Sequence, residues 1–170
     1  MDRLWSPWRL AYVTGSSHAP GCIFCAAIDS VEQSPLVLHR TASCFVILNL
    51  YPYNNGHLMV VPNRHIATLA SATTAELSDV MALTRLAEMA LTEVYNPNGL
   101  NVGINLGKAA GAGVLDHLHV HLVPRWSGDT NFMTVFGDVR VLPEDLTQTA
   151  ERLRPVFERL AGSGSREPEA

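Results

Sequence analysis

The sequence predicts an α+β fold in which an antiparallel sheet packs against one long helix and a C-terminal helix. Two observations lead to this class. Short apolar runs rich in Val, Ile and Leu are separated by turn-forming residues, a pattern typical of antiparallel strands. These runs cluster around a single long helical pattern instead of alternating with helices, which disfavours a parallel nucleotide-binding sheet.

The strands follow from short apolar runs that are bounded by turn residues. The segment 51–56 is rich in Pro, Asn, Tyr and Gly and separates two of these runs. A glycine-bearing loop at 107–113 separates two others. The predicted strands lie at residues 36–39, 43–50, 57–62, 100–106 and 117–123.

Two helices complete the predicted architecture. Thr73 and Glu76 form a capping-box pattern at the start of a helix over 73–95, and the run Asn-Pro-Asn-Gly at 96–99 stops it. A second helix is expected at 143–160. With 170 residues, we expect one domain over 1–161, with its core at about 20–126. The tail 162–170 has no apolar residue able to dock it and is expected to be disordered.

Charge and hydropathy exclude several classes of protein. The chain carries 12 Lys and Arg against 16 Asp and Glu, a net charge of -4, and no long basic block. This balance argues against a general nucleic-acid binder or a binder of anionic membranes. No apolar stretch approaches the roughly 20 residues of a transmembrane helix. Residues 1–10 contain no apolar signal core, so we expect a cytoplasmic location.

The strongest chemical signal is the alternation of His117, His119 and His121 with apolar residues. On a strand, alternate side chains share one face, so the three imidazoles are expected side by side. Imidazoles buried together need hydrogen bonds, a metal or partial charge. A three-histidine zinc site is therefore one alternative. The glycine loop just upstream favours the other, a phosphate site, because glycines let backbone N–H groups approach phosphate oxygens.

The histidine run resembles the motif of the histidine triad (HIT) superfamily. Residues 117–123 read His-Leu-His-Val-His-Leu-Val, which matches its alternation of histidine and apolar residues. Residues 54–62 are similar to the Gly-His strand of the family, and the resemblance extends over about 20–126. The flanks 3–9 and 124–132 resemble a bacterial branch that includes diadenosine tetraphosphate phosphorylase-like proteins.

The resemblance implies a covalent mechanism at an α-phosphorus. His119 is expected to attack through one ring nitrogen and form a nucleotidyl-histidine, while a backbone carbonyl holds the other nitrogen. His121 and His57 are expected beside the phosphate or in support of the sheet. The expected nucleotide-binding residues are Asn49, Asn105, His121 and the loop residues Gly111, Ala112, Gly113, Val114 and Leu115, whose donors stabilise developing charge.

The loop departs from the pattern of many family hydrolases. These carry Gln or Ser immediately after the loop glycine, whereas this chain reads Gly-Ala-Gly-Val-Leu-Asp at 111–116 and is one residue longer. A polyphosphate is already a good leaving group, so the departure favours dinucleoside polyphosphates. The leading hypothesis is a nucleotidyl transferase with inorganic phosphate as acceptor. A hydrolase that uses water and a non-catalytic, zinc-containing nucleotide sensor are the alternatives.

A second site is predicted from the pair Cys22 and Cys25. The Cys-x-x-Cys spacing suits structural zinc, although redox pairs share it. Some bacterial HIT proteins and the related galactose-1-phosphate uridylyltransferases are similar in using two cysteines, a His after the Gly-His strand and the first His of the motif. His65 and His117 occupy these two positions here. The resemblance thus implies a closed, structural zinc site, whereas Cys44 is expected in the core.

A homodimer is the last expectation. HIT proteins that resemble this chain pair two subunits into a continuous sheet, and the helix 73–95 with the strand 100–106 is the candidate interface. The apolar stripe of this helix exceeds what so small a core needs. Its residues are Leu77, Val80, Met81, Leu91 and Val94, and Trp126 or the N-terminal Trp5 and Trp8 are expected to reach toward the partner.

Overall fold

The computed structural model describes residues 21–30, 34–129 and 144–163. The described residues form an antiparallel sheet with the strand order β1-β2-β3-β5-β4. Its strands are β1 (Val37–Arg40), β2 (Cys44–Leu48), β3 (Leu58–Pro62), β4 (Gly99–Gly103) and β5 (Val120–Arg125). The helices are α2 (Ile23–Asp29), α3 (Thr74–Tyr95) and α5 (Leu146–Gly162), with 3-10 turns η1 (Leu69–Ser71) and η2 (Lys108–Ala110). The predicted α+β class is confirmed.

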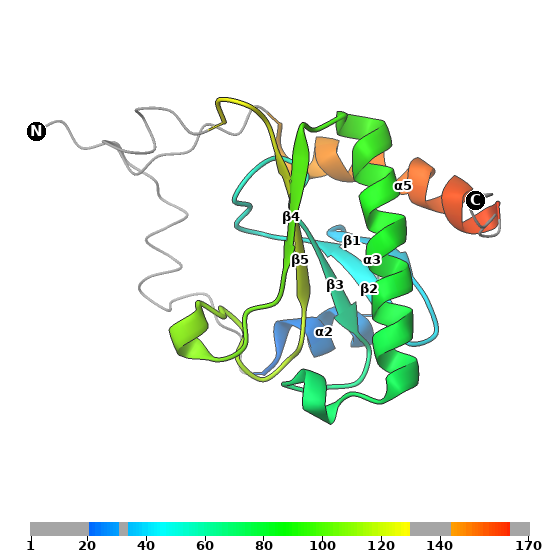
Figure 1. Ribbon diagram of the computed structural model, residues 1–170. Helices are drawn as coiled ribbons and strands as arrows, with labels where there is room; N and C mark the ends of the chain where they lie inside the picture. Colours follow the sequence, from blue (N-terminus) through cyan, green and yellow to red (C-terminus); the bar gives the residue numbers. More distant parts are fainter. Residues whose placement is uncertain (1–20, 31–33, 130–143, 164–170) are drawn as a thin grey trace, which may run out of the picture.

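The helices cover the two faces of the sheet unequally. On one face, α3 and α5 pack against the sheet around a large apolar cluster that includes Leu91, Leu122 and Phe157 (Figure 1). On the other face, α2 contributes Phe24 to a smaller cluster over β1, β2 and β3. Burial of both clusters stabilises the fold through the hydrophobic effect. Cys44 belongs to the larger cluster, which confirms its predicted place in the core.

Helix α3 begins as the sequence predicts. The Thr73 hydroxyl accepts from the Glu76 N–H, and the Glu76 carboxylate accepts from the Thr73 N–H, which completes the capping box. The predicted apolar stripe is only partly correct. Val80 and Leu91 are buried, Leu77 and Val94 are half-buried, and Met81 is 63% exposed. Leu83, Ala87 and Ala90 supply the rest of the buried face.

Four predicted strands, at 43–50, 57–62, 100–106 and 117–123, are longer than the observed β2, β3, β4 and β5. β5 begins at Val120 and not at 117, because continuing its register with β3 would set Leu118 opposite Pro62, which has no N–H to donate. The Leu118 N–H instead donates to the Ile66 carbonyl. β4 ends at Gly103, and the following residues turn into the loop that contains η2, so the prediction of 100–106 was also wrong at that end.

The remaining differences concern helices and chain ends. No helix was predicted at α2, because its seven residues are too few for a clear apolar period. α5 begins after Asp145, whose carboxylate caps its first turn, and continues through Gly162, which had been assigned to the tail. Residues 164–170 and the tryptophans Trp5 and Trp8 lie outside the described residues. The single-domain boundaries remain a prediction.

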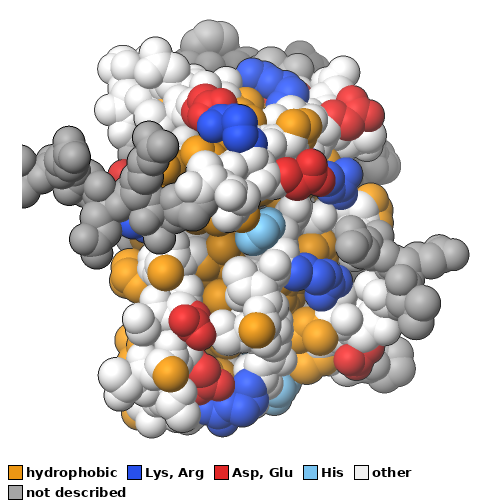
Figure 2. Space-filling model, turned by 90° about the vertical axis from the view of Figure 1, so that its right-hand side faces the viewer, with side chains coloured by type: hydrophobic (Ala, Val, Ile, Leu, Met, Phe, Trp, Pro, Cys, Tyr) orange, Lys and Arg blue, Asp and Glu red, His pale blue; other side chains and the backbone are white. Residues whose placement is uncertain are grey.

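The surface gives two further observations. The face in Figure 2, which is the right-hand side of Figure 1, mixes acidic, basic and apolar side chains without a large area of one charge. Among the described helices, none is both long and apolar enough to cross a lipid bilayer.

Candidate active site and metal centre

Gly56 determines how the chain enters β3 and where His57 is placed. Its φ of +72° lies in the left-handed region, and a Cβ here would approach Tyr95 to 3.0 Å and Leu91 to 3.1 Å. Because both residues belong to α3, a larger side chain would push β3 away from the helix. Glycine thus lets His57, which is 1% exposed, lie immediately before β3.

His119 lies just before β5 and is 4% exposed. Its Nδ1 is 2.8 Å from the backbone carbonyl oxygen of His117. A carbonyl only accepts, so Nδ1 carries the proton and Nε2 keeps its lone pair. Burial lowers the pKa of His119, and the bond to the carbonyl partly opposes this effect. The imidazole is therefore a neutral group with an unprotonated Nε2, the form that a nucleophile requires.

His57 and His121 form a hydrogen-bonded pair with a defined direction. The Tyr53 backbone N–H donates to His57 Nδ1 at 3.0 Å, so the proton of His57 resides on Nε2. This Nε2 lies 2.9 Å from His121 Nδ1, which must accept. The proton of His121 is consequently on its own Nε2. His121 is thus a neutral hydrogen-bond donor beside His119, at 4.8 Å between ring centroids.

The same packing keeps the pair uncharged. Burial, followed by the nearby His121 and His119, lowers the pKa of His57 to about 3. Burial, followed by His119, lowers the pKa of His121 to about 4. Removing an imidazolium from water is unfavourable, and neighbouring imidazolium charges repel one another. Near neutral pH, both rings therefore remain neutral and keep the tautomers described above.

The other predicted nucleotide residues occupy two sides of this histidine cluster. The Asn49 carboxamide accepts from the Tyr51 N–H at 3.0 Å, and its NH₂ group lies 3.3 Å from His57 Nδ1. Asn105 follows β4 and lines a hollow beside His121. Strands β2 and β4 flank the central pair β3 and β5 on opposite sides, so these two amides also lie on opposite sides.

The glycine loop lies near the histidine cluster because one of its apolar residues, Val114, packs there. Val114 packs against the cluster that contains Phe24, and the Phe24 ring lies 5.2 Å from that of His119. Gly111 has a φ of +87° and ends η2. Gly113 and Leu115 are exposed, and Ala112 is half-buried. The loop is therefore close enough to β5 to be part of the site, and the N–H groups of Gly111 and Ala112 donate to loop carbonyls at residues 108 and 107.

The predicted metal ligands converge on one point. One ligand atom from each of Cys22, Cys25, His65 and His117 lies within 4.8 Å of the others. Cys22 Sγ is 3.3 Å from His117 Nδ1, and Cys25 Sγ is 3.2 Å from His65 Nδ1 and 3.7 Å from His117 Nδ1. Tetrahedral zinc with ordinary Zn–S and Zn–N bonds separates sulfur and nitrogen by roughly 3.6 Å. The four residues therefore fit zinc.

The chemistry of the four donors agrees with this geometry. His117 Nε2 donates to the Pro62 carbonyl at 2.8 Å, which leaves Nδ1 unprotonated and directed toward the cysteines. Burial, followed by the nearby Cys22, raises the pKa of the Cys25 thiol. Two adjacent thiolates are unfavourable without a cation, and zinc would supply its charge. The three cysteines are all free in the structure.

His117 connects the two sites. Its side chain contributes to the Cys-His cluster, while its backbone carbonyl holds His119 Nδ1. His119 and His121 are neighbours as predicted, with ring centroids 4.8 Å apart, although both His117 and His119 precede β5. The His117 side chain belongs to the Cys-His cluster instead. Its ring packs against Phe24 at 5.4 Å and His65 at 5.0 Å. The prediction of three imidazoles aligned on one strand needs this correction.

Several contributors were missed by the sequence analysis. The Tyr53 N–H, the Pro62 carbonyl and the His117 carbonyl fix the three tautomers, yet a backbone group has no sequence signal. Phe24, whose ring packs against both His117 and His119, belongs to the unpredicted α2. The Cys-x-x-Cys spacing was the signal that pointed to this segment.

An antiparallel sheet with neutral histidines at its centre and a Cys-His cluster beside them defines a class of α+β proteins with a histidine-built site. A family model described as HIT domain matches residues 30–128, which is more than half of the chain. The chain belongs to the HIT family, as the motif predicts.

Its relatives include named enzymes and solved structures. The chain is 40% identical to the AP-4-A phosphorylase of Mycobacterium tuberculosis (strain ATCC 25618 / H37Rv) over 94% of its length and 86% of that protein. It is 34% identical to the asymmetrical bis(5'-nucleosyl)-tetraphosphatase of Schizosaccharomyces pombe, over 55% of this chain and 50% of that one. A Zn-bound histidine triad protein of Mycobacterium smegmatis is 28% identical, with a TM-score of 0.67 over 84% of this chain and 96% of that one.

Proposed function

We propose that this HIT protein is a nucleotidyl transferase that cleaves dinucleoside polyphosphates at an α-phosphate, with inorganic phosphate as acceptor. The observation that carries the proposal is the pair of complementary imidazole tautomers. His119 presents an unprotonated Nε2, and His121 presents a protonated one next to it. The names of the relatives support a nucleotide-processing enzyme and tetraphosphate substrates.

The first step forms a covalent intermediate. His119 Nε2 attacks the α-phosphorus, the N–P bond forms, and the P–O bond to the polyphosphate breaks with its electron pair. From diadenosine tetraphosphate, AMP is left on His119 and ATP departs. His121 donates to a non-bridging oxygen that gains charge, and the loop 111–115 assists it through the N–H groups of residues 113–115, because those of Gly111 and Ala112 donate to loop carbonyls. His57 is a positioning residue, because its hydrogen bond to His121 Nδ1 holds the proton of His121 on Nε2.

The second step returns the histidine to its original state. An oxygen of inorganic phosphate attacks the bound phosphorus, the N–P bond breaks, and ADP is released. The polyphosphate that departs in the first step is an anion and needs no proton. This agrees with a loop whose residues 112–115 carry no acidic side chain. Zinc would have a structural role, with Cys22, Cys25, His65 and His117 as its ligands, and would hold the His117 carbonyl in place.

The products identify the acceptor. We expect diadenosine tetraphosphate and phosphate to give ADP and ATP, because phosphate intercepts the intermediate. With ³²P-labelled phosphate, the label should appear in ADP, which chromatography of the products measures. AMP and ATP at an unchanged rate without phosphate would identify a hydrolase instead. No turnover, together with measurable nucleotide binding, would identify a nucleotide sensor.

The exposed side of α3 and β4 supports a homodimer. β4 is an edge strand, and Met81 and Val102, which is 50% exposed, line a hollow between α3 and β4. A second copy would pair with this edge and cover both side chains, which makes the interface symmetric. Trp126, which was expected to reach toward the partner, packs edge-on against Tyr95 at the end of α3 within the same chain.

Light scattering tests the assembly. We expect twice the 18.5 kDa mass of one chain at low micromolar concentration, and a Met81→Glu variant shifted toward the monomer because its carboxylate would be buried in the interface. A wild-type monomer with full activity at that concentration would contradict the dimer. A cytoplasmic location and the absence of nucleic-acid and membrane partners remain predictions from composition.

A further inference from the structure

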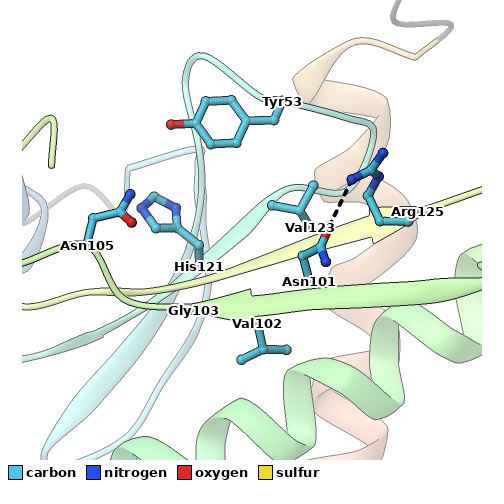
Figure 3. Close-up of a pocket in the computed structure, with 8 residues that line it drawn as sticks. All are labelled: Tyr53, Asn101, Val102, Gly103, Asn105, His121, Val123 and Arg125. Carbon is cyan, nitrogen blue, oxygen red and sulfur yellow. Dashed lines mark hydrogen bonds between the residues drawn. The ribbon is translucent and has the colours of Figure 1, made fainter. Parts of the chain in front are cut away.

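A hollow of about 260 Å³ lies on the face of the sheet that is opposite to α3 (Figure 3). His121 and Arg125 of β5 mark its two ends, and Asn101, Gly103 and Asn105 line its other side. Tyr53 overhangs it from the segment before β3. Arg125 lies four positions after His121 on the strand, or roughly 13 Å away. The hollow thus begins at the histidine cluster and extends away from it.

The hollow is open because the sheet is covered unevenly. On this face, the cluster around α2 covers β1, β2 and β3, and no described element covers β4 and β5. Gly103 lies directly across from His121 in the register and has no side chain to fill the space. A Cβ built on Gly103 would find no heavy atom within 4 Å. Gly103 consequently leaves open space beside His121.

The charges of the hollow do not suit a phosphate. The Arg125 guanidinium donates to both carboxylate oxygens of Asp129, at 2.6 and 2.8 Å, and to Asn101 Oδ1 at 2.9 Å. Its positive charge is therefore balanced within the protein. Because Asn101 Oδ1 already accepts, its NH₂ group remains as a donor, and the Asn105 carboxamide has no hydrogen bond within the described part of the chain. These amides suit an uncharged polar ligand.

Tyr53 adds an aromatic surface to this polar lining. Its ring lies at 26° to the His121 ring, 6.1 Å away between centroids, and it is 48% exposed. Exposed aromatic rings next to amides bind planar heterocycles by stacking and edge hydrogen bonds. The open space at Gly103, an aromatic ring and two carboxamides together fit a nucleobase with its ribose.

The position of the hollow relates it to the leaving group. The rings of His119 and His121 are in contact, so a phosphorus at His119 has the hollow on its β4 side. Asn49 lies on the opposite, β2 side. A substrate with one nucleoside at each end of a phosphate chain can therefore extend in both directions from the reacting phosphorus.

We propose that the hollow between β4, β5 and Tyr53 binds the second nucleoside of the substrate, which leaves with the polyphosphate. This proposal rests on the proposed function and defines its substrate class: dinucleoside polyphosphates are preferred over mononucleoside polyphosphates of equal phosphate length. Gly103 is the specificity-determining position, because any side chain there occupies the space of the departing nucleoside.

A Gly103→Val variant tests the subsite. Valine suits a strand and meets no protein atom at Cβ, so the variant should fold. We expect kcat/KM for diadenosine tetraphosphate to fall about tenfold, the effect of losing one base-stacking interaction. For adenosine 5'-tetraphosphate, which has no second nucleoside, we expect a change of less than about twofold by the same measure. Wild type should prefer the dinucleotide by a similar factor of about ten.

Gly99→Val is the matched control. Gly99 lies on the same face of β4, its Cβ also meets no atom within 4 Å, and it does not line the hollow. The Gly99→Val variant should leave kcat/KM unchanged for both substrates. Equal losses for both substrates in Gly103→Val, or no loss for either, would overturn the subsite while wild-type turnover sustains the proposed function. Failure of wild type to cleave either compound would overturn the proposed function and the subsite with it.

Discussion

His119→Ala should abolish turnover, with a loss of more than about 10⁴-fold in kcat, because no other group can form the covalent intermediate. Nucleotide binding should persist, since His121, Asn49 and Asn105 are unchanged. Steady-state assays with diadenosine tetraphosphate measure the first effect, and equilibrium binding of a nucleotide measures the second. Under this proposal, wild type quenched with denaturant at alkaline pH, where the acid-labile N–P bond survives, should also carry adenylate on the peptide that contains His119.

Two further variants separate chemistry from folding in this experiment. His119→Asn can still donate to the His117 carbonyl but has no nucleophilic nitrogen, so it should fold and be equally inactive. His39→Ala removes a half-buried imidazole that stacks on Phe157, away from the histidine cluster, and should retain activity. Adenylate trapped on His117 or His121, or turnover by His119→Asn, would refute the assignment of the nucleophile.

Replacing Cys22 and Cys25 with serine should remove about one zinc per chain and markedly lower the melting temperature. The cluster joins α2 to the segments after β3 and before β5, so its loss frees three parts of the chain at once. Structural zinc sites contribute several kcal/mol to folding, or a fall of about 10 °C or more for a chain of this size. Elemental analysis and thermal denaturation measure the two effects.

Cys44→Ala provides the control for the loss of a thiol. Cys44 is buried in the core and is remote from the cluster, so this variant should keep its zinc with only a modest loss of stability. Protein purified without chelators that contains no zinc would argue decisively against the site. An unchanged melting temperature in the double variant would show that the metal does not stabilise the fold.

Local patterns were sufficient for much of the fold. The capping box of Thr73 and Glu76 involves residues three apart, so it is visible in the sequence and present in the structure. Strand ends were predicted less well. Nothing local reveals that the β5 ladder stops before Leu118, because the missing N–H belongs to Pro62, which is 56 residues earlier. α2 was missed because a short helix has too few turns to show a period.

The sequence by itself determined which residues carry the chemistry, since the alternating histidines and the Cys-x-x-Cys pair are local motifs. Only the tertiary structure decided what each imidazole can do. Backbone groups of Tyr53, Pro62 and His117 select the protonated nitrogen of each ring, and a carbonyl direction depends on strand register, not on residue type. The hollow beside His121 likewise exists only because β4 brings Gly103 opposite it, in a pairing that no local pattern specifies.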